Sequence, residues 1–163
     1  MKKLLLAIAT TGILLPSCKK SSSSTPAPSS SIPANGWKLG TTSYTTALSA
    51  RLAAINELSA FDGIPSGSSP AVNSLNAYFS VLPTAAGTYH IVGYPAPSLG
   101  ANDLGLSAGL YATSATYVST GTDGINATVT VTGGKIKIVI PAVWVKNTTA
   151  GDSLKLTGTL IEQ

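Results

Sequence analysis

Side chains capable of acid–base or nucleophilic chemistry are sparse in this 163-residue sequence. His90 is the single histidine, and in a hydrolytic triad it would act as the base. Ser80 or Ser119 could then supply the nucleophile, and Asp103 could orient the imidazole. His90 stands, however, among strand-forming residues, where a histidine without a catalytic role is the simpler interpretation. We therefore expect a non-catalytic protein, with a secreted hydrolase that uses His90 and a carboxylate as the alternative.

The acidic residues are too dispersed to indicate a catalytic pair or a metal site. Asp62-Gly63 and Asp123-Gly124 have the composition of turns. A calcium site needs several oxygen ligands close together, and the loop at 120–126 offers few. No glycine-rich phosphate loop is found between a predicted strand and a predicted helix. We expect no metal and no cofactor.

The single cysteine, Cys18, stands between an apolar segment and a serine-rich one, and it excludes an intramolecular disulfide. Residues 1–17 begin with two lysines and continue with an apolar core of about a dozen residues, the layout of a secretory signal. The junction Leu15-Pro16-Ser17-Cys18 resembles the lipobox of bacterial lipoproteins. This resemblance implies removal of residues 1–17 and acylation of Cys18, which would attach the chain to a membrane. An ordinary secreted protein with an incidental cysteine is the alternative.

Residues 18–35 and 36–163 differ sharply in composition. The first segment is rich in serine and proline and predicts a flexible tether. The second is long enough for one domain with its own core, and we expect that domain to be monomeric. Its six basic and six acidic residues cancel, so the formal net charge of +4 comes from the first twenty residues. A nucleic-acid binder needs a dense basic surface, so we expect no nucleic-acid partner.

Aromatic side chains are the remaining candidates for a binding surface, because flat rings supply large contact areas and can stack on sugars. Tyr94 is the strongest candidate, since it lies beside two prolines in the turn-rich segment 94–103. Tyr111 and Trp37 are further candidates. Trp144 is another possible platform, but it lies between Val143 and Val145 in an apolar run, so packing in the core is the favoured interpretation.

The clearest structural element is a β-hairpin over 126–147. Apolar residues alternate with threonine in NATVTVT and with lysine in KIKIVI, and Gly133-Gly134 forms the two-residue turn between them. Pro141 interrupts the second arm and predicts an edge, a bulge or a corner of the sheet. A further strand at 154–160 is expected to pair with the strand that holds Trp144.

The remaining strands are shorter and their signals are weaker. Strands are predicted at 37–46, 104–111 and 115–119, and a second hairpin from 75–81 and 88–94. The segment 47–61 has leucine and isoleucine at helical spacing, which favours a helix on local propensity. A pair of strands with a turn near Asn56 is the other interpretation.

Several phrases together resemble small lipoproteins of the Bacteroidota type over nearly the whole chain. They are SCKK, the Ser/Thr/Pro tether, GWKLGTTSYT, AYFSVLPTAAGTYHIV, INATVTVTGGKIKIVIPAVWVKN and DSLKLTGTL. The resemblance implies an all-β domain, an antiparallel β-sandwich of roughly 7–9 strands, with 47–61 forming two strands, and it carries over no functional residues. Asp152-Ser153-Leu154 also resembles an O-glycosylation acceptor of such proteins, although it fits a turn entering a strand equally well.

These observations predict a lipoprotein of the cell envelope, in the outer membrane, whose domain faces either the periplasm or the cell surface. Its β-sandwich is expected to be a non-catalytic binding or structural module. The expected partners are membrane lipid, through acylated Cys18, and a glycan or another envelope protein.

Overall fold

The computed structural model describes residues 31–66 and 71–163, so the predicted signal segment, Cys18 and most of the predicted tether lie outside the described residues. The described part contains eleven strands and one short 3₁₀ turn, η1 (Ala53–Ile55), which confirms the all-β prediction but exceeds the expected 7–9 strands. The strands are β1 (Gly36–Leu39), β2 (Thr42–Thr45), β3 (Leu48–Leu52), β4 (Glu57–Phe61), β5 (Ser74–Phe79), β6 (Gly87–Ile91), β7 (Asp103–Leu110), β8 (Ala115–Ser119), β9 (Asn126–Thr132), β10 (Lys135–Asn147) and β11 (Ser153–Ile161).

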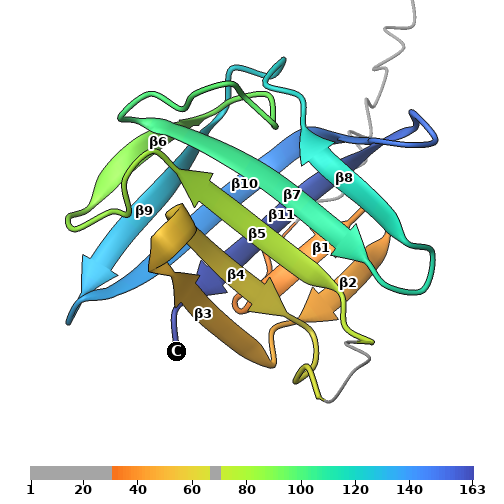
Figure 1. Cartoon of the computed structure of the whole chain (residues 1–163), viewed down its shortest axis with the longest axis horizontal. Coiled ribbons are helices and arrows are strands. Elements are labelled where there is room, and N and C mark those ends of the chain that lie inside the picture. The colour runs from red at the N-terminus through yellow and green to blue at the C-terminus, as the bar shows by residue number, and fades with distance from the viewer. Residues whose placement is uncertain (1–30, 67–70) are drawn as a thin grey trace, which may run out of the picture.

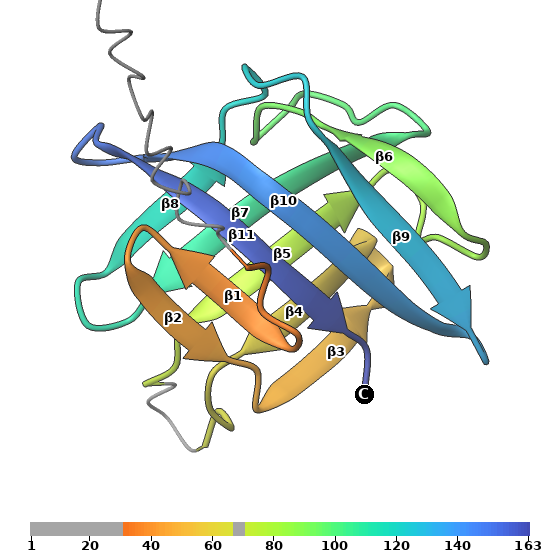
Figure 2. The same ribbon diagram turned by 180° about the vertical axis from the view of Figure 1, so that it is seen from behind.

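The strands form one continuous sheet that folds over into two layers. Its order is β2-β1-β11-β10-β9-β6-β7-β5-β4-β3, and β8 joins β10 to β7. Figure 1 shows the layer with β3, β4, β5, β7 and β8 in front, and Figure 2 shows β1, β9, β10 and β11 in front. All pairings are antiparallel except the short contact of β6 with β7. The fold is therefore sandwich-like, but its two layers belong to a single sheet.

The core lies between the two layers. Along β10, buried isoleucines alternate with exposed lysines, so one side of the strand faces the core and the other faces solvent. The largest fully buried side chains come from both layers: Trp37, Leu58, Leu75, Leu104, Leu106, Val129, Ile136, Ile138, Ile140, Val145, Leu156 and Leu160.

The predicted hairpin over 126–147 is confirmed. β9 and β10 pair in register, and Gly133 and Gly134 both have positive φ, as a tight hairpin turn requires. The pairing of β10 with β11 shifts between Ile140 and Val143, so Pro141 lies at a bulge. Beyond the bulge β10 pairs with β8 instead of β9, which closes the ring β10-β9-β6-β7-β8. The expected pairing of Trp144 with the last strand is also observed.

The second predicted hairpin is wrong. β5 and β6 are strands, but β5 pairs with β4 and β7, whereas β6 pairs with β9 and β7. Both edges of β5 are therefore already occupied, and the connector at 80–86 carries the chain to the other layer.

The segment 47–61 forms two strands, as the resemblance implied. β3 and β4 pair antiparallel, and Asn56 closes the turn with a left-handed backbone (φ 52°, ψ 45°). Its side-chain amide donates to the carbonyl of Ser80. The leucines at helical spacing do not share a face, because Leu58 is fully buried while Leu52 and Ile55 are exposed.

In the described ranges, no helix has the length and apolar character needed to cross a membrane.

Candidate functional site

Tyr94 follows β6 and lies against the outer face of the layer that contains β5 and β7. Its ring stacks on Tyr78 of β5, with ring centroids 4.3 Å apart and planes 7° from parallel. Gly105 of β7 lies directly under Tyr94, since a Cβ added there would be 2.5 Å from Tyr94 Cδ2. Strand pairing aligns Tyr78 with Gly105. The glycine thus leaves the space that the tyrosine ring occupies.

Tyr94 also lines a surface groove with a volume of about 470 Å³. The other sides of the groove come from the loop after β6, from β8 and from β10, and include Pro95, Pro97, Val118, Thr120 and Lys146. The volume is comparable to that of small-molecule sites, but the groove is open to solvent and not an enclosed cavity. The combination of an aromatic ring, two prolines, hydroxyl groups and an ammonium group can make both apolar and hydrogen-bonding contacts with a polyhydroxylated ligand.

Polar side chains continue from the tyrosine pair across the outer face of the same layer. Glu57 of β4 pairs in register with Tyr78, and its carboxylate accepts a hydrogen bond from Ser59 Oγ. Ser107 Oγ lies 3.3 Å from Asn76 Nδ2 and 3.4 Å from the hydroxyl of Tyr78. Burial, reinforced by Tyr78 and then by Glu57, raises the pKa of Tyr94 above its ordinary value. The Tyr94 hydroxyl therefore stays protonated at neutral pH and can donate a hydrogen bond.

The other two predicted binding residues lie elsewhere. Tyr111 is 49% exposed but follows the far end of β7, six residues from Gly105, or roughly 20 Å along a strand. Trp37 is fully buried and stacks on Tyr44, with ring centroids 5.2 Å apart. The prediction that Trp37 forms part of a binding surface is wrong, because β1 turns this side chain into the core, where it packs over Gly158 of the neighbouring strand.

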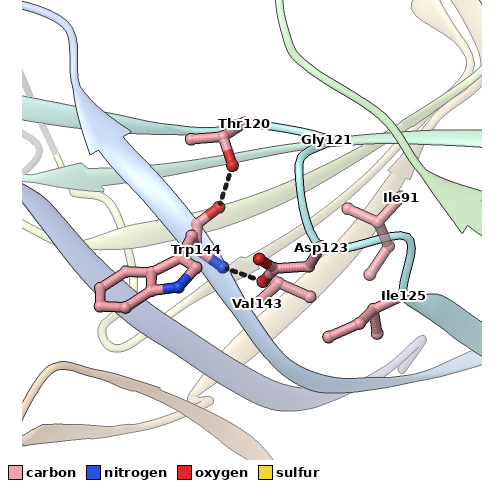
Figure 3. Close-up of a pocket in the computed structure, with 7 residues that line it drawn as sticks. All are labelled: Ile91, Thr120, Gly121, Asp123, Ile125, Val143 and Trp144. Atoms are coloured by element: carbon pink, nitrogen blue, oxygen red, sulfur yellow. Dashed lines mark hydrogen bonds between the residues drawn. The ribbon is translucent and has the colours of Figure 1, made fainter.

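Trp144 was expected in the core, and this prediction is also wrong. Its indole is 41% exposed, because it alternates with the buried Val143 and Val145 along β10. Lys155 Nζ lies 4.4 Å from the ring centroid, a cation–π arrangement, and also forms an ion pair with Asp123 at 3.3 Å. In Figure 3 the Asp123 carboxylate reaches the backbone amide of Trp144, at 2.9 Å.

The cavity beside Trp144 in Figure 3 is too small for a ligand. Its volume is about 10 Å³, at the lower limit for a single water molecule. Asp123 is occupied by its contacts with Trp144 and Lys155. Among the described residues there is no group of three His, Cys, Asp or Glu side chains that could hold a metal ion.

The residues of the alternative hydrolytic site do not form a triad. His90 is exposed on β6 and aligns with Asp103, but the Asp103 carboxylate accepts the backbone N–H of Gly100 at 2.8 Å. Ser119 is buried, where its hydroxyl donates to the carbonyl of Val92. Ser80 Oγ donates to the carbonyl of Gly100.

One further sequence pattern, not considered above, resembles a catalytic motif. Residues 105–109 read Gly-Leu-Ser-Ala-Gly, which has the spacing of a nucleophile elbow. That motif requires a sharp turn between a strand and a helix, whereas all five residues lie within the regular strand β7. Ser107 is therefore a strand residue whose hydroxyl faces Asn76 and Tyr78.

No protein-family model matches this chain, and neither the curated proteins nor the solved structures contain a match to it.

Proposed function

We propose that this chain is a lipoprotein of the cell envelope, anchored through acylated Cys18, whose domain binds glycans without catalysis. The observation that carries the binding proposal is the placement of Tyr94. Its ring is supported by Tyr78 and Gly105 and borders a groove that also contains hydroxyl groups and Lys146.

A pre-positioned aromatic ring favours binding because little side-chain freedom is lost when a ligand arrives. Tyr94 meets this condition, since the stack on Tyr78 restricts its ring. Sugars present one apolar face and many hydroxyl groups, which suits a ring bordered by hydroxyl groups and an ammonium group. Asn76 is half-buried beside the same tyrosine pair and can contribute a polar contact, whereas Glu57 and Ser59 are buried and support the pair from below the surface.

The binding proposal is tested by screening the protein on a glycan array and measuring the affinity of any hit by calorimetry. Replacing Tyr94 with Ala should weaken binding at least tenfold, or about 1.4 kcal/mol, as expected for an aromatic anchor. Tyr111→Ala is the matched control, because Tyr111 is an exposed tyrosine outside the groove, and it should leave the affinity unchanged.

Circular dichroism of both variants confirms that they remain folded. Equal affinities of the Tyr94→Ala and wild-type proteins would show that the groove is not the site. A complete absence of glycan binding would favour recognition of another envelope protein.

The anchoring proposal is tested separately, by intact-mass spectrometry of the protein purified from membranes. Loss of residues 1–17 together with added acyl chains is the expected result, and Cys18→Ser should abolish both changes. A soluble, unacylated product would contradict the anchor without bearing on the groove.

A further inference from the structure

The lysines of the domain gather on one face of the molecule. Residues 31–163 contain five lysines, and all of them lie on β1, β10 or β11, the layer in front in Figure 2. The outer face of these three strands is called the lysine face below, and its members are Lys38, Lys135, Lys137, Lys146 and Lys155.

Strand register places these side chains on the same side of the sheet. Directly paired residues point to one face, as do residues two apart along a strand. Lys38 pairs with Thr157, which is two residues from Lys155. Lys155 pairs in turn with Trp144, which is two residues from Lys146.

The other end of the face follows by the same reasoning. Lys137 pairs with Ile161, which shares a face with Thr157 four residues earlier. Lys135 lies two residues before Lys137, and the intervening Ile136 is fully buried. From Lys135 to Lys146 the face extends over roughly 35 Å of strand.

The overall neutrality of the domain thus conceals a strong asymmetry. Lys155 forms an ion pair with Asp123, whereas in the described residues no carboxylate lies within ion-pair distance of the other four lysines. The opposite layer carries no lysine: its charged residues include Glu57 and Asp103, and its Arg51 is paired with Glu162. The lysine face therefore has a net positive charge and is complementary to an anionic partner.

Trp144 adds a second feature to this face. Its indole is 41% exposed in the middle of the lysine face, with the ammonium of Lys155 above the ring. Exposed tryptophan and lysine occur together where proteins meet the headgroup region of a bilayer. Charges spread over an extended, exposed sheet suit a planar anionic surface better than the groove of a nucleic-acid duplex.

We infer that the lysine face docks on a bilayer that contains anionic lipid, with Trp144 entering the headgroup region. Each lysine held near such a surface changes the ratio of docked to free domain about fivefold, which corresponds to ~1 kcal/mol. Lys146 belongs to both surfaces, so the lysine face and the proposed glycan groove meet at β10. Docking through the rest of the face would hold Tyr78 and Tyr94, on the opposite layer, away from the membrane.

The test uses the full chain coupled through its single cysteine, Cys18, to a maleimide lipid in vesicles, so that the result does not depend on acylation in cells. Brominated lipid then quenches tryptophan at the bilayer surface. Trp37 is buried, so Trp144 should supply the quenched signal, and Trp144→Phe should remove it. We expect quenching with phosphatidylglycerol present, little quenching in pure phosphatidylcholine, and its loss at about 1 M salt, where the Debye length is ~3 Å.

The double variant Lys38→Gln/Lys137→Gln should lower the docked ratio about 25-fold. A matched control adds Ile64→Lys and Val81→Lys, which restore the net charge at positions 74% and 70% exposed, outside the lysine face. We expect the control to remain as weakly docked as the double variant. Three results would each overturn the inference. They are full recovery of vesicle docking in the control variant, equal tryptophan quenching in neutral vesicles, and binding of duplex DNA without docking on vesicles.

Discussion

Replacing Gly105 with Ala should dislodge Tyr94 and destabilise the domain. The new Cβ would lie 2.5 Å from Tyr94 Cδ2, and an ordinary contact needs at least 3.4 Å, so the ring must move by about 0.9 Å. Tyr94 cannot retreat without disturbing its stack on Tyr78, which contributes about 0.5–1.5 kcal/mol. Together with the usual cost of overpacking, we expect the free energy of unfolding to fall by about 2 kcal/mol.

Urea unfolding followed by circular dichroism measures this change. Gly109→Ala is the matched control, because Gly109 lies on the same strand and the same face, and its nearest contact is the flexible Ser74 hydroxyl at 3.0 Å. We expect Gly109→Ala to alter the free energy of unfolding by no more than about 0.5 kcal/mol, since lower unfolded-state entropy offsets the mild crowding.

A double-mutant cycle identifies the cause. In a Tyr94→Ala background the added Cβ no longer meets the ring, so Gly105→Ala should become neutral or slightly stabilising, a coupling of about 2 kcal/mol. The proposed packing of the Tyr94 ring against Gly105 is refuted if Gly105→Ala destabilises the domain no more than Gly109→Ala does. It is also refuted if Gly105→Ala destabilises the domain equally with and without the Tyr94 ring.

Two further predictions concern contacts that join distant strands. Ser119→Ala should lower the free energy of unfolding by about 1–3 kcal/mol, because the amide of Leu106 and the carbonyl of Val92 both lose the Ser119 hydroxyl as their hydrogen-bond partner. Ser80→Ala, which removes an exposed hydrogen bond, should have little effect. Urea unfolding measures both changes. Burial alone would raise the pKa of Glu162, but hydrogen bonds from Arg51 and the Ile136 amide lower it below its ordinary value. The stabilisation by Glu162, about 1 kcal/mol, is therefore present above the unfolded-state pKa of about 4.3 and is lost as the pH falls through the lowered pKa. The stabilities of wild type and Glu162→Gln should converge once the pH is below that lowered pKa. A stability difference that persists unchanged at low pH would contradict this account.

The parts of the fold that were predictable from the sequence depend on neighbouring residues. The alternation in β9 and β10 and the Gly133-Gly134 turn suffice to specify their hairpin locally. The partners of β5 and β6 depend instead on strands far along the chain, and no local pattern shows that both edges of β5 are occupied. The turn at Asn56 was harder to predict, because its left-handed backbone interrupts the segment 47–61, whose leucine and isoleucine spacing favours a helix.

The candidate site was only partly predictable for the same reason. Tyr94 stood out because prolines and turn residues surround it, but Tyr78 and Gly105, which position its ring, come from two other strands. The error on Trp144 came from reading three apolar neighbours as one buried run, when strand alternation exposes the middle one. The even division of charge in the sequence likewise gave no sign that every lysine of the domain would lie on one layer.

The pairing of β1 with β11 has a consequence for how the protein is made. β1 pairs locally with β2, but its other neighbour is the last strand of the chain, and β2 pairs with nothing but β1. During translation the β1-β2 hairpin must therefore remain separate from the rest of the sheet until nearly the whole chain has left the ribosome. A chain truncated before β11 would leave one edge of β1 and one edge of β10 without a partner, and it should be a ready substrate for proteases.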